Sequence, residues 1–183
     1  MIVTWHGGNC FRLEASGWQV LVDPETTEGG SRLKGDVVVR TESEPPFALG
    51  SLNEVRAPGE YGFREAKIRG VLVASASSPE RLRTAYRIEL DDIRFGFLGN
   101  ATSPLAEDEL EALGTIDVLF IPAHEKAADF AKAIEPKMVV PGAGDREKIA
   151  RAFGQRPEPH EKLVLKRKDI EGEAGTKLIF LMG

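Results

Sequence analysis

The chain has 183 residues, of which 42% are hydrophobic and 29% are charged, a composition typical of a folded globular protein rather than a disordered one. Its 24 Lys and Arg against 29 Asp and Glu give a net charge of −5, which argues against a nucleic-acid partner because such proteins carry a basic footprint. One cysteine excludes an intrachain disulfide and every cysteine-rich zinc motif. The length predicts a single domain over residues 1–183.

Histidine is scarce. The three histidines, His6, His124 and His160, are far apart, and the sequence contains no His-x-His or His-x-x-x-His pair. A histidine-rich metal centre is therefore excluded by composition. No apolar run approaches the roughly 20 residues of a membrane span, and the first residues lack the pattern of a signal peptide. We expect a cytoplasmic protein without a membrane partner.

The first half of the chain is predicted to be mostly antiparallel β-structure. Short apolar runs alternate with turn residues. The predicted strands cover residues 2–5, 10–14, 19–22, 36–40, 68–74, 85–90 and 93–98.

In the second half the pattern alternates between strands and helices. We expect helices that open at Ser103-Pro104, cover 126–134 and run from Asp145 to Gly154. Strands are predicted at 118–121 and 138–140, each stopped by a proline, and at 162–166 and 177–181. The basic cluster of Lys162 and residues 166–168 alternates with leucines, which predicts a solvated strand face.

Several stretches, taken together and in this order, resemble the metallo-β-lactamase fold. The similarity is closest to its small branch of ascorbate-phosphate-lactonase-like, metal-dependent hydrolases. The stretches are TWHGGNCFRL (4–13), VLVDP (20–24), DVVV (36–39), APGEY (57–61), IRG (68–70), GN (99–100), DVLFIP (117–122) and EPKMVVP (135–141). The resemblance implies a four-layer αββα sandwich of two mixed β-sheets flanked by helices, of α/β class. Its pseudo-twofold symmetry would explain two Asp-led strands, at Asp36 and Asp117.

The metal-ligand positions of that family hold other residues in this chain. The resemblance places Glu42 and Glu44 at the two leading histidines, Pro46 and Phe47 at the next two ligands, and Asn100 at the aspartate of the Gly-Asp motif. A late histidine is expected near 143, where the chain has alanine, and a middle one within 74–78, which holds none. The expected site therefore lacks most of the side chains that bind zinc.

Five residues remain candidates for chemistry. Glu42 and Glu44, with Asp23 nearby if the resemblance holds, form either a site for a hard cation, an acid/base pair, or solvated loop acids. His124 is either a general base, a new ligand or a polar loop residue, and Asn100 is a further candidate.

We therefore expect a metallo-β-lactamase-fold protein that has lost the zinc ligands and acts as a non-catalytic binding or assembly protein. It would need no cofactor. Its partner would be a small molecule, another protein or a second copy of itself. The alternative is a metal-dependent hydrolase with a remodelled carboxylate site at Glu42 and Glu44, which would use one divalent cation such as Mg²⁺, Mn²⁺ or Zn²⁺.

Overall fold

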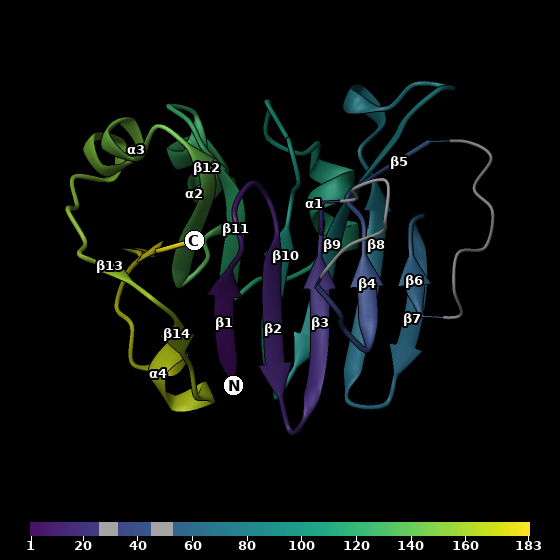
Figure 1. The fold of residues 1–183 in the computed structure, drawn as a ribbon. Helices are drawn as coiled ribbons and strands as arrows, with labels where there is room; N and C mark the ends of the chain where they lie inside the picture. Colours follow the sequence, from purple (N-terminus) through teal and green to yellow (C-terminus); the bar gives the residue numbers. More distant parts are fainter. Residues whose placement is uncertain (26–32, 45–52) are drawn as a thin grey trace.

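Two mixed β-sheets pack face to face in the computed structural model, which describes residues 1–25, 33–44 and 53–183 (Figure 1). The first sheet has the spatial order β14-β1-β2-β3-β4-β6. The strands β1, β2 and β3 are antiparallel, whereas β4 and β6 continue the sheet in parallel. The bounds are β1 Ile2–Trp5, β2 Phe11–Ala15, β3 Trp18–Val22, β4 Val37–Val39, β6 Glu54–Val55 and β14 Leu163–Val164.

The second sheet has the order β15-β12-β11-β10-β9-β8-β7. Its β7–β10 half is antiparallel, and β10, β11, β12 and β15 are parallel. The bounds are β7 Gly59–Phe63, β8 Ala66–Leu72, β9 Leu82–Leu90, β10 Ile93–Phe97, β11 Val118–Ala123, β12 Met138–Gly144 and β15 Lys177–Leu178. β13 (Pro159–His160) and β16 (Phe180–Leu181) form a separate two-stranded sheet.

One short strand connects the two sheets. β5 (Glu42–Ser43) follows β4 of the first sheet along the chain, but it pairs with β9 of the second. The backbone amide of Thr84 also donates to the carbonyl of Thr41 at 2.9 Å. This crossing brings the segment after β4 to the edge where the two sheets meet.

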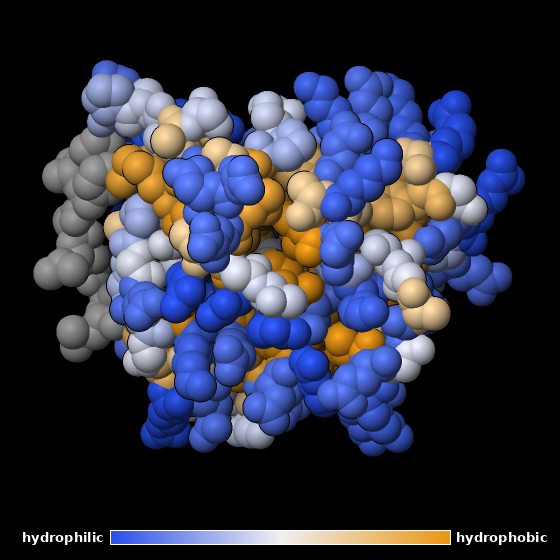
Figure 2. All heavy atoms as spheres, turned by 180° about the vertical axis from the view of Figure 1, so that it is seen from behind, coloured by the Kyte–Doolittle hydropathy of each residue, from blue (hydrophilic) through white to orange (hydrophobic). Residues whose placement is uncertain are grey.

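The helices are α1 (Glu107–Leu113), α2 (Ala127–Ile134), α3 (Arg146–Phe153) and α4 (Arg167–Glu171), and Ala74–Ala76 form a 3₁₀ turn. One apolar core fills the space between the sheets, and a second lies between the second sheet and α1, α2 and α3. Seen from behind, this face shows mostly hydrophilic side chains with apolar residues between them (Figure 2). Within the described ranges, no helix is long and apolar enough to cross a membrane.

The sandwich of two mixed sheets confirms the predicted fold class, and several predicted boundaries are wrong. β11 passes through Pro122 and β12 passes through Pro141. Both are tolerated because the β11–β12 pairing shifts register between Ile121 and Ala123, and β15 pairs with β12 only at Met138 and Val139. The first helix begins at Glu107, four residues after the predicted cap at Ser103.

The basic cluster near the C-terminus is also placed differently. Residues 167 and 168 begin α4 instead of extending a strand, and the carboxylate of Asp169 accepts a hydrogen bond from the amide of Lys166 at 2.8 Å. This contact satisfies a free amide at the helix start. The strand β7 was not predicted because the glycines Gly59 and Gly62 interrupt its apolar pattern.

The two Asp-led strands occupy equivalent positions in the two sheets. Asp36 precedes β4 and exchanges two hydrogen bonds with the backbone of Gln19, the second residue of β3, both at 2.8 Å. Asp117 precedes β11 and exchanges the same two bonds with the backbone of Arg94, the second residue of β10, at 2.9 and 2.8 Å. Each aspartate therefore joins the start of a parallel strand to its neighbour.

Candidate functional site

The predicted site residues gather at the edge where β3, β4, β10 and β11 end, the upper edge in Figure 1. Asp23 follows β3, Glu42 lies just after β4, and Asn100 follows β10. A cavity of about 10 Å³, with room for about one water molecule, lies beside Asp23. Its walls are Asn9, Phe11, Asp23, Phe97, Gly99, Phe120 and Ile121.

Two arginines form ion pairs with Glu42 and Glu44, the carboxylates that the sequence analysis selected. Glu42 lies directly across the β5–β9 pair from Arg83, and its carboxylate contacts the guanidinium groups of Arg81 and Arg83 at 3.1 and 3.2 Å. Glu44 contacts the same Arg81 at 3.1 Å. Two carboxylates and two guanidinium groups thus form a charge-balanced cluster, which removes the repulsion expected between two neighbouring acids.

The Asp23 carboxylate accepts two hydrogen bonds from Thr41. The backbone amide of Thr41 donates to Oδ1 at 2.7 Å and the Thr41 hydroxyl donates to Oδ2 at 2.5 Å. Burial nevertheless raises the pKa of Asp23 to about 6, because the loss of hydration outweighs the two hydrogen bonds and the nearby charge of Arg40. The negative charge of Glu42 adds to this increase, which places the two carboxylates in the same local field.

Asn100, at the position of the Gly-Asp aspartate, forms an amide pair. The Nδ2 of Asn9 donates to its Oδ1 at 2.7 Å, and Arg83 donates to its backbone oxygen at 3.3 Å. On β12 of the same sheet, the amide of Ala143 donates to the carbonyl of Gly8 at 2.9 Å. Asn100 and Ala143, at the positions that the resemblance assigns to an aspartate and a late histidine, therefore form hydrogen bonds to the loop between β1 and β2.

His124 follows β11 at the same edge, and backbone groups hold its ring. Its Nε2 contacts the carbonyl of Ala101 at 3.2 Å, and its Nδ1 lies 3.2 Å from the backbone amide of Lys126. The tautomer with the proton on Nε2 satisfies both contacts, so both ring nitrogens have backbone partners. His124 lines a different cavity, with Asp145 and Lys148.

The described residues do not fit a zinc site. Among residues 1–25, 33–44 and 53–183, no group of three or more His, Cys, Asp and Glu side chains comes close enough to hold a metal ion. The carboxylates of Glu42 and Asp23 are engaged with arginines and with Thr41, and the amides of Asn9 and Asn100 bind each other. Pro46 and Phe47, which the resemblance places at two further ligand positions, lie outside the described residues.

Arg81 and Arg83 were missed as site residues from the sequence. Their spacing carries a usable signal, since Arg81-x-Arg83 repeats the two-residue interval of Glu42-x-Glu44 with the opposite charge. In extended strands, residues two apart point to the same side. Only the pairing of β5 with β9, however, shows that the two pairs face each other.

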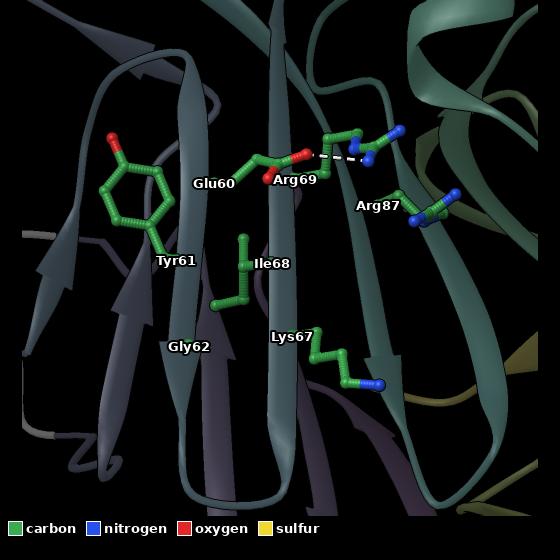
Figure 3. Close-up of a pocket in the computed structure, with 7 residues that line it drawn as sticks. All are labelled: Glu60, Tyr61, Gly62, Lys67, Ile68, Arg69 and Arg87. Atoms are coloured by element: carbon green, nitrogen blue, oxygen red, sulfur yellow. Dashed lines mark hydrogen bonds and ion pairs between the residues drawn. The ribbon is translucent and has the colours of Figure 1, made fainter.

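A second cavity, of about 300 Å³, lies on the outer face of β7, β8 and β9 (Figure 3). Its arginines are used to hold α1. Arg69 donates to the carbonyl of Ala112 at 3.2 Å and binds Glu60 at 2.6 Å, and Arg87 donates to the carbonyl of Leu113 at 3.2 Å. Positive charge at the carboxyl end of a helix is stabilising, and α1 has no basic residue of its own there. These side chains therefore have a structural role.

Comparison with known families shows which class of protein has this sandwich of two mixed sheets. The profile of the beta-lactamase superfamily domain matches residues 2–143, so the chain belongs to the beta-lactamase superfamily. No curated protein matches the chain by sequence.

Solved structures share the fold at low sequence identity. A Thermotoga maritima protein assigned to the Zn-dependent hydrolases of the metallo-β-lactamase superfamily superposes with a TM-score of 0.78 and 22% identity, over 99% of both chains. Igni18, a metallo hydrolase from Ignicoccus hospitalis, superposes with a TM-score of 0.64 and 17% identity, over 90% of this chain and 99% of its own. At these identities the likeness shows the fold alone.

Proposed function

We propose that this chain is a beta-lactamase-superfamily protein that has given up zinc-dependent hydrolysis and serves as a non-catalytic binding or assembly protein. The observation that carries the proposal is the pairing of Glu42 with both Arg81 and Arg83. A metal ion at this edge would have to displace two guanidinium groups from the carboxylate and would then face their positive charge. Without a bound cation, no water at this edge is brought to the pKa near 7 that zinc-dependent hydrolysis requires.

The size of the space at the edge supports the same proposal. A cavity of about 10 Å³ lined by Phe11, Phe97 and Phe120 has no room for a metal ion together with a substrate group. The similar solved structures are named as metal-dependent hydrolases. The experiment therefore has to distinguish a non-catalytic protein from a metal-dependent hydrolase.

Metal content tests the proposal. The full chain is purified without chelator, incubated with Zn²⁺ or Mn²⁺, desalted and measured by elemental analysis beside the double variant Glu42→Gln/Glu44→Gln. We expect below about 0.1 ion per chain in both proteins, because the carboxylates are already neutralised by arginines. About one ion per chain that the double variant fails to retain would overturn the proposal and support the remodelled carboxylate hydrolase.

Assembly is measured separately. Light scattering coupled to gel filtration gives the molecular mass directly, and a mass of two chains or more would identify a second copy as the partner. A mass of one chain at all concentrations would restrict the proposal to binding of a small molecule or another protein.

A further inference from the structure

A cavity of about 360 Å³ lies at the end of the sandwich, between α3, the loop that follows it and β16. It is lined by Arg146, Glu147, Ala150, Arg151, Arg156, Pro157 and Phe180. None of these residues lines the cavity at the candidate site. Three guanidinium groups and one carboxylate thus face one small space in a chain whose overall charge is negative.

The three arginines differ from those at the candidate site in their partners. Among the described residues, neither Arg146 nor Arg151 nor Arg156 forms an ion pair with a carboxylate. By contrast, Arg81 and Arg83 are neutralised by Glu42 and Glu44. With three guanidinium groups against the single carboxylate of Glu147, the lining of the end cavity has an excess of positive charge, which favours an anion as its partner.

Arg146 is held in place before any ligand arrives. Its guanidinium donates to the carbonyl of Leu181 and lies 4.9 Å from the ring centre of Trp5 and 5.3 Å from that of Phe180. The Nε of Arg151 donates to the carbonyl of Glu147 at 3.3 Å, which leaves its terminal nitrogens available. Such prior ordering reduces the entropy lost on binding.

We propose that this cavity binds a small phosphate monoester. Guanidinium groups match the oxygens of a phosphate with paired hydrogen bonds, and three of them suit a group with two negative charges. Ala150, Pro157 and the edge of Phe180 provide an apolar wall for the organic part. The volume lies in the range of small-molecule sites, roughly 300–1,000 Å³.

Calorimetry with phenyl phosphate tests the site in the full chain. We expect saturable binding of one ligand per chain, at least about tenfold weaker in Arg151→Gln/Arg156→Gln because two charge-assisted contacts are lost. Both side chains are exposed, so the double variant keeps the fold. The matched control is Arg64→Gln. Arg64 is on the turn between β7 and β8, where its guanidinium lies over the ring of Trp18. This variant should bind phenyl phosphate within about twofold of the unaltered chain.

Further arms separate the phosphate from other anions. Inorganic phosphate should bind more weakly than phenyl phosphate because it cannot use the apolar wall, and succinate should bind more weakly than either. Nuclear magnetic resonance of the unaltered chain gives a readout without substitutions, since phenyl phosphate should shift the amide signals of 146–157. The proposal is overturned by absence of saturable binding, by equal weakening in Arg64→Gln, or by signals that shift elsewhere. This site is independent of the metal question, so its failure leaves the proposed function standing.

Discussion

At the scale of single residues, Gly99 determines how tightly the candidate site closes. Its φ of +56° lies in the left-handed region, and a Cβ at this position would overlap the Thr41 side chain. Thr41 in turn holds both oxygens of Asp23. Gly99 therefore couples the turn after β10 to the carboxylate after β3.

Replacement of this glycine should be costly. We expect Gly99→Ala to lower the free energy of unfolding by about 2–4 kcal/mol, since left-handed strain adds to overpacking against Thr41. Gly154→Ala is the matched control, because Gly154 also has a positive φ, of +63°, but a Cβ there meets nothing within 4 Å. It should cost about 1 kcal/mol. Equal losses in urea denaturation would contradict the packing argument.

Asp23 gives stability a pH dependence of unusual sign. Its pKa in the folded protein, about 6, lies above the ordinary value of 3.8, so the folded state binds a proton more tightly than the unfolded chain. Stability contributed by this residue is therefore largest at acidic pH and falls as the pH rises from about 4 to about 6. The fall should approach about 3 kcal/mol.

The variant Asp23→Asn isolates this effect, because the amide does not titrate and can accept the same hydrogen bond from Thr41. The difference in unfolding free energy between the unaltered chain and the variant should decrease from pH 4 to pH 7. Parallel stability curves over that interval would show that the Asp23 carboxyl is not perturbed by burial.

At the scale of elements, the pairs β3–β4 and β10–β11 are built alike but stabilised differently. Asp36 is exposed, whereas Asp117 is 4% exposed and also contacts the guanidinium groups of Arg94 at 2.7 Å and Arg167 at 3.0 Å. Burial works to raise the pKa of Asp117, but the hydrogen bonds from Arg94 and the charges of Arg94 and Arg167 outweigh it and hold the pKa below its usual value.

Loss of the buried carboxylate should therefore cost more than loss of the exposed one. We expect Asp117→Ala to destabilise by about 3 kcal/mol or more, because it strands Arg94 and an unpaired backbone amide. Asp36→Ala should cost about 1 kcal/mol. The Asp117 contribution is present above pH 4 and is lost as the pH falls through the lowered native pKa. Thermal melts of both variants at pH 7 and pH 3 measure the difference, and equal losses at pH 7 would contradict it.

At the scale of the whole molecule, a cluster of phenylalanines joins the two sheets. The ring of Phe120 on β11 lies 4.4 Å from that of Phe97 on β10, stacked, and 4.7 Å from that of Phe11 on β2, edge-on. The rings lie directly beneath the candidate site and form part of its cavity wall. The site is thus closed from below by the core that holds the sandwich together.

Phe120→Ala should lower the free energy of unfolding by about 3–5 kcal/mol. The substitution opens a void between the two sheets, and the sheets cannot move toward each other to fill it. Phe153→Ala provides a control on α3, where the ring is only partly buried against the outer core, and should cost less. Chemical denaturation of the two variants decides this, and the reverse order would place the main stabilising contacts in the outer core.

The local pattern of the sequence predicted most of the elements but not all their ends. Alternating apolar residues, the cap at Asp145 and the stop at Gly154 are local signals, and the structure agrees with them. Pro122 and Pro141 were misleading, because whether a strand can accept a proline depends on which neighbour it pairs with at that residue. That pairing is a tertiary property.

Composition by itself limits the chain to three histidines that are far apart in the sequence, and the motifs predicted which edge of the fold to inspect. Only the tertiary structure decided what occupies that edge. Arg81 and Arg83 lie about forty residues after Glu42 in the chain, and they reach it because β5 crosses from one sheet to pair with β9 of the other. The physical reason is that a contact between charges depends on distance in space, which local sequence patterns do not specify.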